Sequence, residues 1–263
     1  MRNSASISPP LLPDIVFWRG RLNRMIDCGN NEDWECIMGN EEMVLENATK
    51  GRTHDTIALG VCLSLVGGFL DAYSYLLKGR VFANAQTGNL VLLFVSFAAG
   101  EWGKALKYLV PIVTFAFGIF FSAFVSNKSS VTPYRRLSGV LLFESLALAA
   151  IGLFGVRFQH DIVNSVISFI AAVQVANFDK IDGHPMATTM ITGNLKSGML
   201  NAAKYLHMKE MRYLHSCITY LVIIAAFGLG VAIGFFAIRL WKEQAIWVCE
   251  AFIMAAWVMS RGA

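Results

Sequence analysis

Long apolar blocks separated by short charged breaks run from Ile57 to near the end of the chain. A helix that crosses a bilayer needs about 20 predominantly apolar residues, and about 17 can suffice. The second, sixth and eighth blocks are the shortest or most polar, so we expect between six and eight spans. The predicted spans are residues 56–77, 87–100, 105–126, 137–156, 162–178, 188–206, 213–238 and 245–260.

Helices are the regular structure that fits these blocks. Backbone N–H and C=O groups cannot stay unpaired in lipid, so a spanning segment is either a helix or a strand of a closed barrel. Barrel strands have about ten residues of alternating polarity, whereas these blocks are longer and continuously apolar. The pattern therefore predicts an all-α, polytopic integral membrane helical bundle. Lys and Arg balance between its two sides and leave its orientation open.

The N-terminal segment differs from the rest of the chain. It is polar and mixed in charge, and it lacks the apolar h-region and cleavage site of a signal peptide. Such a composition buries too little apolar surface to offset the entropy of ordering. We expect a disordered tail over residues 1–52 and a transmembrane helical domain over 53–263. Residues 1–50 are expected to be dispensable for folding. We expect Met43 as an alternative start of translation.

The helical domain shows an internal repeat. A shift of 105 positions places Thr-Gly-Asn-Leu at 87–90 on the same four residues at 192–195, and Tyr108-Leu109 on Tyr213-Leu214. A second coincidence at the same offset makes chance a poor explanation. Four spans in each half would give both halves the same orientation, so we expect two similar halves in a parallel internal repeat. The halves cover residues 55–156 and 160–260.

Composition supports the membrane assignment and narrows the function. The chain is 56% hydrophobic and 15% charged, whereas soluble domains are about 45–50% apolar and about 25% charged. The formal charge of +4 is spread over many loops, without the basic stripe that nucleic-acid binding needs. Cysteine and histidine spacings indicate no zinc site, and no phosphate loop appears. We expect no metal, no cofactor, no nucleic acid and no enzyme activity.

The repeated Thr-Gly-Asn element supplies most candidate binding residues. A threonine where a helix begins can cap free backbone N–H groups, glycine allows close approach of a ligand, and asparagine adds an amide donor and acceptor. Helix starts inside the membrane can hold an anionic group. Plain capping and helix packing explain the same pattern equally well. The candidates are Thr87, Gly88, Asn89, Thr192, Gly193 and Asn194.

Charged and amide side chains inside the apolar blocks are further candidates. A carboxylate within a span is costly and marks a functional site by default, which applies to Asp71 and Glu144. Lys196, one turn into the sixth block, could neutralise either acid. This set fits an interior ion pair as well as a proton or solute site. Gln174 and Asn177 lie one turn apart and can hydrogen-bond across helices.

Gly230 and Gly234 form a G-x-x-x-G pattern in the seventh block. Small residues at this spacing allow close helix approach, either within the protomer or between two copies. The expected partners are therefore the lipid bilayer, a small solute, and a second copy in a homodimer through Gly230 and Gly234.

Two stretches resemble a known family. One has the form G-x-x-D-A-x-S-Y and the other Phe-x-x-x-x-T-G-N, and a second T-G pair follows about a hundred residues later. These residues are Gly68, Asp71, Ala72, Ser74, Tyr75, Phe82, Thr87, Gly88, Asn89, Thr192 and Gly193. With them, Ile57 to Arg239 is similar to the YoaK-like family of uncharacterised multi-pass membrane proteins. The resemblance implies a bacterial inner-membrane protein of unknown function and supplies no catalytic residues.

The duplicated helix starts and the intramembrane charges favour a secondary transporter or permease-like protein for a small solute. The alternative is a non-transporting membrane scaffold or assembly subunit that uses the same polar residues for packing. An intramembrane enzyme is a third, less supported reading. A polar, water-accessible cavity between the halves would favour transport, and a dry, packed interface would favour the scaffold.

Overall fold

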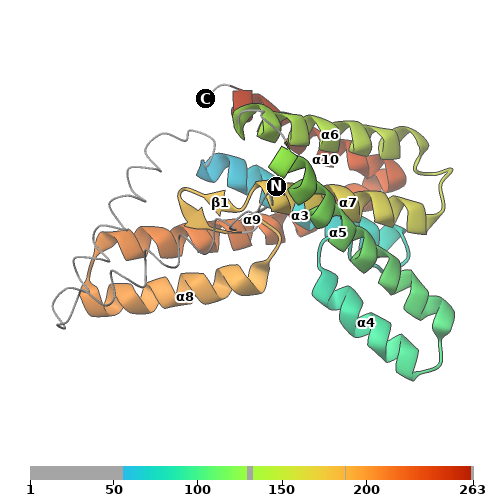
Figure 1. Cartoon of the computed structure of the whole chain (residues 1–263), viewed down its shortest axis with the longest axis horizontal. Helices are drawn as coiled ribbons and strands as arrows, with labels where there is room; N and C mark the ends of the chain where they lie inside the picture. Colours follow the sequence, from blue (N-terminus) through green and yellow to red (C-terminus); the bar gives the residue numbers. More distant parts are fainter. Residues whose placement is uncertain (1–55, 129–132, 187, 262–263) are drawn as a thin grey trace, which may run out of the picture. The chain divides into compact units, whose positions relative to one another are not determined.

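The computed structural model describes residues 56–128, 133–186 and 188–261. The predicted tail, residues 1–52, lies outside the described residues. Each predicted block coincides with one helix, so the all-α prediction is confirmed (Figure 1). The helices are α3 Ile57–Leu77, α4 Gln86–Ala98, α5 Trp102–Lys128, α6 Pro133–Phe154, α7 His160–Asn177, α8 Ile191–Met208, α9 Met211–Trp241 and α10 Ile246–Arg261, with a 3₁₀ turn at Lys242–Ala245.

Apolar helices of membrane-spanning length account for much of this domain. Four described stretches are long and apolar enough to cross a membrane, and the last covers both α9 and α10. They are Ile57–Leu77, Trp102–Ser126, Arg135–Phe154 and Met211–Arg261. Large apolar side chains such as Phe94, Phe120 and Leu146 are exposed on α4, α5 and α6. Surface of this kind is stable against lipid, so the chain is a multi-pass membrane protein.

Helix α3, the most buried of these stretches, packs closely along α9 in the same direction. Gly230 of α9 lies against the backbone of Leu65, and Gly234, one turn later, lies against Phe69. No Cβ fits at Gly230 without displacing the α3 backbone. The glycine face is therefore buried inside the protomer, and the expected homodimer through Gly230 and Gly234 is wrong.

Helix α7 runs antiparallel to α3. Asn164, near the start of α7, donates from Nδ2 to the backbone oxygen of Lys78, just after α3 ends, at 2.8 Å. Ile181, just after α7 ends, packs on Gly60 near the start of α3. The bundle thus has a Lys78 end, where α3 ends and α7 begins, and a Gly60 end, where α3 begins and α7 ends.

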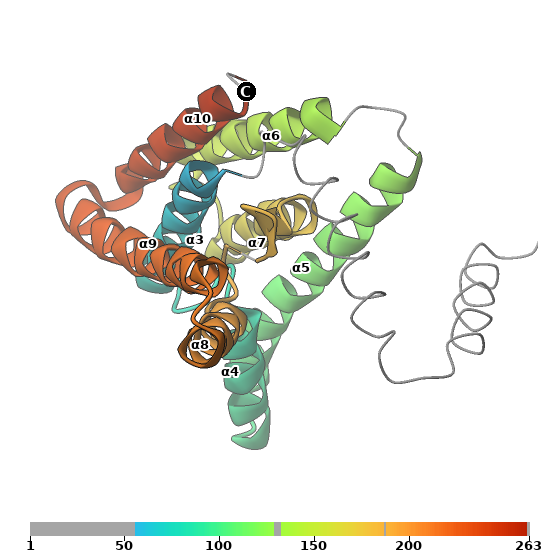
Figure 2. The same cartoon turned by 90° about the vertical axis from the view of Figure 1, so that its left-hand side faces the viewer.

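Helices α5 and α7 form a second parallel pair, opposite in direction to the α3–α9 pair. Gly118 of α5 packs against Ala172 of α7, and one turn further Asn177 donates from Nδ2 to Ser122 Oγ at 2.7 Å. Helices α6 and α10 pack antiparallel, with Ser138 and Ser260 joined through their hydroxyls at 3.0 Å. In Figure 2, seen along the bundle, α6 and α10 lie on the side opposite to α4 and α8.

Helix α4 starts halfway along α3 rather than at its end. After Lys78 the chain turns back, and Asn84 donates from its backbone N to Asp71 Oδ1 and from Nδ2 to the Gly67 oxygen, both at 2.8 Å. The 13 residues of α4 rise about 20 Å, short of the roughly 30 Å hydrocarbon core. Helix α5 then begins at the Lys78 end, where Lys107 reaches Gly79. Helix α4 therefore returns to the end from which the chain came.

Helix α8 repeats this course from the other end. After α7 the hairpin of β1 (Lys180–Ile181) and β2 (His184–Pro185) leads back along α3. Ser64 donates to the Thr188 oxygen at 3.1 Å, and α8 starts three residues later. Helix α9 begins at the Gly60 end, where His215 meets Asp182 of the hairpin at 2.8 Å. Figure 1 shows α4 and α8 starting near the centre and running to opposite ends.

The expected parallel orientation of the two halves is wrong. That prediction assumed that each half crosses the membrane four times. Helices α4 and α8 instead begin partway along the bundle, and each returns to the end from which the chain entered. The first helices of the two predicted halves, α3 and α7, run antiparallel, as the bond between Asn164 and the Lys78 oxygen shows.

Candidate functional site

The turn before α4 is held by residues that the sequence analysis took as ligand candidates. The Asn89 side chain accepts from the Phe82 N–H at 3.0 Å and donates back to the Phe82 oxygen. Gly88 lies against the Phe82 ring, which a Cβ would displace. Gly79 and Arg80 reverse the chain direction with φ of 87° and 62°. Gly88 and Asn89 therefore shape the start of α4.

Asp71 places its carboxylate at the start of α4. It is 5% exposed, and Oδ1 accepts from the Asn84 N–H at 2.8 Å. The residue before the helix is Ala85, so Thr87 is the second helical residue and does not cap it. Asn84 precedes the first residue of α4, so this bond fixes the turn that leads into the helix.

The start of α8 has the same local sequence without such a carboxylate. Met190 precedes the helix and provides no side-chain cap, so Thr192 is again the second helical residue. The expected threonine caps are therefore wrong at both helices, although both helix starts were predicted to within one residue. At the repeat offset, Ala176 of α7 stands where α3 carries Asp71.

Both helix starts open into one cavity of about 740 Å³. Its walls come from α3, α4, α5, α7, α8 and α9, and they are mainly apolar and aromatic. Among the described residues that line it, Asp71 is the one acidic or basic residue. The polar lining residues are Asp71, Tyr75, Asn84, Gln86, Thr87, Thr189 and Thr192, and Gly193 lies beside them.

The cavity therefore collects four of the predicted site residues, namely Asp71, Thr87, Thr192 and Gly193. The other candidates lie elsewhere. Asn194 is buried inside the α8 packing, and Asn177 joins α7 to α5. Gln174 is buried in α7, and its Nε2 has no hydrogen-bond partner among the described residues.

Lys196 and Glu144 do not meet. Lys196 is exposed on α8, and the ion pairs between described residues join it to neither Asp71 nor Glu144. Glu144 is 1% exposed on α6 and faces α10, where Ser145 donates to Glu250. Neither carboxylate oxygen of Glu144 has a hydrogen-bond partner in the described part of the chain. The expected neutralisation by Lys196 is therefore wrong.

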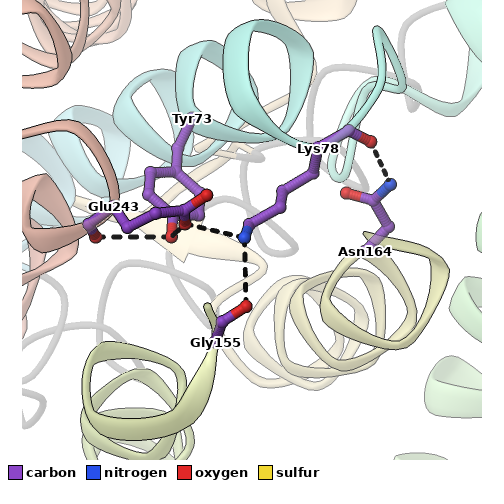
Figure 3. A network of polar contacts seen from close by, with 5 residues as sticks. All are labelled: Tyr73, Lys78, Gly155, Asn164 and Glu243. Atoms are coloured by element: carbon purple, nitrogen blue, oxygen red, sulfur yellow. Dashed lines mark hydrogen bonds and ion pairs between the residues drawn. The ribbon is translucent and has the colours of Figure 1, made fainter. Parts of the chain in front are cut away.

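A buried network at the Lys78 end was not anticipated from the sequence (Figure 3). Lys78 is 1% exposed, and its Nζ lies 2.7 Å from Glu243 Oε2 and donates to the Gly155 oxygen at 3.2 Å. Tyr73 donates to the same Glu243 oxygen at 2.7 Å. The network ties the ends of α3 and α6 to the turn between α9 and α10. Because Lys78 and Glu243 stand in different charged breaks, sequence alone offered no signal that pairs them.

The family described as "Protein of unknown function (DUF1275)" matches residues 59–259. The chain belongs to this family. The "UPF0700 transmembrane protein YoaK" of Bacillus subtilis (strain 168) is 24% identical over 157 residues, which cover 57% of this chain and 68% of that protein. The expected membership of a YoaK-like family of uncharacterised membrane proteins is confirmed. No solved structure matches the chain.

In this DUF1275 protein the cavity is lined by residues from the stretches that carried the family resemblance. Asp71, Tyr75, Phe82 and Thr87 from the first half and Thr192 from the second all line it. The duplicated Thr-Gly pair was the sequence pattern that predicted these lining residues. No pattern predicted the aromatic lining residues, because large apolar residues occur throughout a membrane protein.

Proposed function

We propose that this DUF1275 protein is a secondary transporter or permease-like protein that carries a small solute through the cavity between α4 and α8. The observation that carries the proposal is the meeting of two helix starts, one reached from each end of the bundle, at a single cavity. Broken helices whose N-termini meet near the bilayer midplane are how many transporters hold their substrates. The volume of about 740 Å³ lies within the usual range of small-molecule sites.

The proposal includes an inverted repeat with six crossings, α3, α5 and α6 in the first half and α7, α9 and α10 in the second. The pairing of helices supports it, because α3 with α9 and α7 with α5 are equivalent contacts when the halves are exchanged. Inverted repeats permit two related states that open to opposite sides. The proposed location is the plasma membrane of a bacterium, and the proposed activity involves no enzymatic step.

A membrane scaffold is the second candidate, and a specific observation favours it. Asn89, Asn177 and Lys78 are satisfied by partners inside the protomer, as expected if polar residues serve packing. The cavity favours the transporter over the scaffold, because packing does not explain an open space between two helix starts. The predicted site residues that bear on this choice are Asp71, Thr192 and Gly193.

The test is a thermal-shift panel of small metabolites on the purified full chain. A ligand that binds only the folded state raises the melting temperature with its concentration. Gly193→Leu should remove the response, because its side chain projects into open space beside the cavity. Gly139→Leu on the exposed face of α6 is the matched control, since a Cβ there also meets no neighbouring atom.

A solute that stabilises wild type and Gly139→Leu but not Gly193→Leu supports the proposal, and its uptake into vesicles then tests transport. If no solute in the panel stabilises the wild type more than Gly193→Leu, the scaffold is the better account.

A further inference from the structure

Helices α6 and α10 bring two carboxyl groups together inside the bundle. Glu144 lies near the middle of α6, about 16 Å from either end of that helix, and is 1% exposed. Glu250 faces it from α10 and is partly exposed. An ionisable side chain at such a depth in a membrane protein is costly, and by default it marks a functional site.

Three of the four carboxyl oxygens have no hydrogen-bond partner in the described part of the chain. They are both oxygens of Glu144 and Oε2 of Glu250. The fourth, Glu250 Oε1, accepts from the Ser145 hydroxyl. A donor favours the ionised form of the carboxyl group that it serves, and an ionised group buried without a donor or a cation costs free energy. Glu250 is therefore the better placed of the two to carry a negative charge, and Glu144 to carry a proton.

The helices around this pair place no cation against it. The ion pairs between described residues include neither acid. On α10 the neighbouring titratable group is the buried Cys249 thiol, which interacts with both carboxyl groups. Helix α7 packs on α6 and α3 packs on α10. In α7 residues 162–177 carry no titratable side chain, and in α3 residues 57–70 carry only Cys62.

The charged groups at the ends of these helices have partners of their own. Arg136, about two turns before Glu144 on α6, bonds to the Ser126 hydroxyl of α5. In the turn before α10, Glu243 is paired with Lys78. The charge of the carboxyl pair is thus left to be balanced by a ligand.

A proton is the ligand that fits this arrangement. The described residues contain no group of three or more His, Cys, Asp or Glu side chains that could hold a metal ion, whereas a bound metal ion usually takes about three or more protein ligands. A proton needs one oxygen and no coordination shell. Both oxygens of Glu144 are available to it.

The pair also joins the two halves of the helical domain. Helix α6 is the last of the first half and α10 the last of the second, and Ser145 and Glu250 occupy equivalent positions at the repeat offset of 105. A change in the packing of α6 on α10 therefore changes the separation of the two carboxyl groups. Because repulsion between like charges depends on their separation, it also changes how many protons the pair holds.

We propose that Glu144 and Glu250 form a proton-binding site that holds one exchangeable proton on Glu144, with the partly exposed Glu250 as the group through which the proton enters and leaves. Uptake converts one carboxylate and one hydronium ion into a carboxyl group and a water molecule. The pair then carries one negative charge instead of two. Proton binding is independent of the proposed function, and only its coupling to solute movement rests on that function.

The experiment is infrared spectroscopy of the purified full chain at neutral pH, because the carbonyl stretch of a protonated carboxyl group is separate from the bands of carboxylates. The wild type should show this band, and Glu144→Gln should lose it. Asp71→Asn, at the other buried acid, is the matched control and should keep it. In the wild type, isotope-labelled glutamate should shift the band and isotope-labelled aspartate should not, which tests the site without any substitution.

The rate of exchange tests the route through Glu250. In heavy water the band of the wild type should shift as deuterium replaces the proton. Glu250→Gln should keep the band, because Glu144 still lacks a donor and a cation, and should slow this shift several-fold. Leu142→Gln, on the exposed side of α6, should exchange at the rate of the wild type.

Each outcome bears on one part of the proposal. A wild type without a protonated glutamate band overturns the proton site. A band that survives in Glu144→Gln overturns its placement on Glu144, and exchange in Glu250→Gln at the rate of the wild type overturns the route. None of these results depends on the cavity, so the metabolite panel decides the proposed function on its own.

Discussion

The starts of α4 and α8 are built from the same Thr-Gly-Asn element and open into the same cavity, yet their surroundings differ. Before α4, Asp71 accepts from the Asn84 N–H, and the Asn89 side chain accepts from the Phe82 N–H. The start of α8 has Ala176 at the position equivalent to Asp71 and open space at Gly193. The same four residues thus begin two helices whose contacts inside the protein differ.

The largest expected effect concerns the network that holds the first half at the Lys78 end. Glu243→Gln should lower the free energy of unfolding by about 3 kcal/mol, because it leaves the buried Lys78 cation without its counter-ion. At the repeat offset, the position of Lys78 corresponds to Gly183 in the second half, which carries no charge. The measurement is thermal unfolding in detergent.

The control is the double variant Glu243→Gln with Lys78→Met, which removes both charges of this ion pair. It should recover most of the lost stability. A double variant that is less stable than Glu243→Gln would show that Lys78 is stabilised by groups other than Glu243.

The next effect tests the closure of α4 directly. Asp71→Ala should destabilise the protein by about 1–3 kcal/mol, because the buried Asn84 N–H loses its acceptor inside the bundle. Ala176→Asp in the second half is the comparison. If the halves were equivalent, the two changes would have opposite effects of similar size; we expect the loss at Asp71 to exceed any gain at Ala176. Melting temperatures of both variants decide this.

Glu144 of α6 is a buried carboxyl group outside the cavity and can be compared with Asp71. It faces Glu250, and neither of its oxygens has a hydrogen-bond partner among the described residues. Glu144→Gln removes a carboxyl group whose ionised form is costly inside a span and should leave stability unchanged or raise it by about 1 kcal/mol. A clear loss of melting temperature would mean that a cation holds Glu144 in place. Leu142→Gln, on the exposed side of α6, controls for the added amide.

The smallest effect is expected at the two threonines. Thr87→Ala and Thr192→Ala should each change the free energy of unfolding by less than about 0.5 kcal/mol, because neither residue caps its helix. Loss of solute stabilisation in Thr192→Ala alone would agree with a ligand at α8. A loss of about 1 kcal/mol in stability, typical of a removed cap, would contradict the helix starts as described.

Much of the fold could be predicted from the sequence because apolar blocks of fixed length have few solutions in lipid. The eight blocks and the two helix starts followed from pattern alone. Direction did not, because it depends on whether a short block such as residues 87–100 crosses the membrane or returns. The hydrogen bonds from Asn84 to Asp71 and Gly67 turn the chain back before α4. Hydropathy does not predict such contacts.

Candidate residues were predicted less well for a related physical reason. Thr87 and Asn89 are both polar and two positions apart, but residues at this spacing on a helix point in different directions. Thr87 therefore lines the cavity, whereas Asn89 holds the turn before the helix. The β1–β2 hairpin was missed although Asp182-Gly183, both with positive φ, is a recognisable hairpin signal.

Antiparallel orientation of the two halves is the central claim, since it alone brings the starts of α4 and α8 to one cavity. The direct measurement is labelling of single cysteines, Glu101→Cys in the α4–α5 turn and Glu210→Cys in the α8–α9 turn, with a membrane-impermeant maleimide. Both glutamates are exposed, and the native cysteines are first replaced. In sealed vesicles of one orientation, one cysteine should label from outside and the other only after permeabilisation. Labelling of both from the same side would contradict the account.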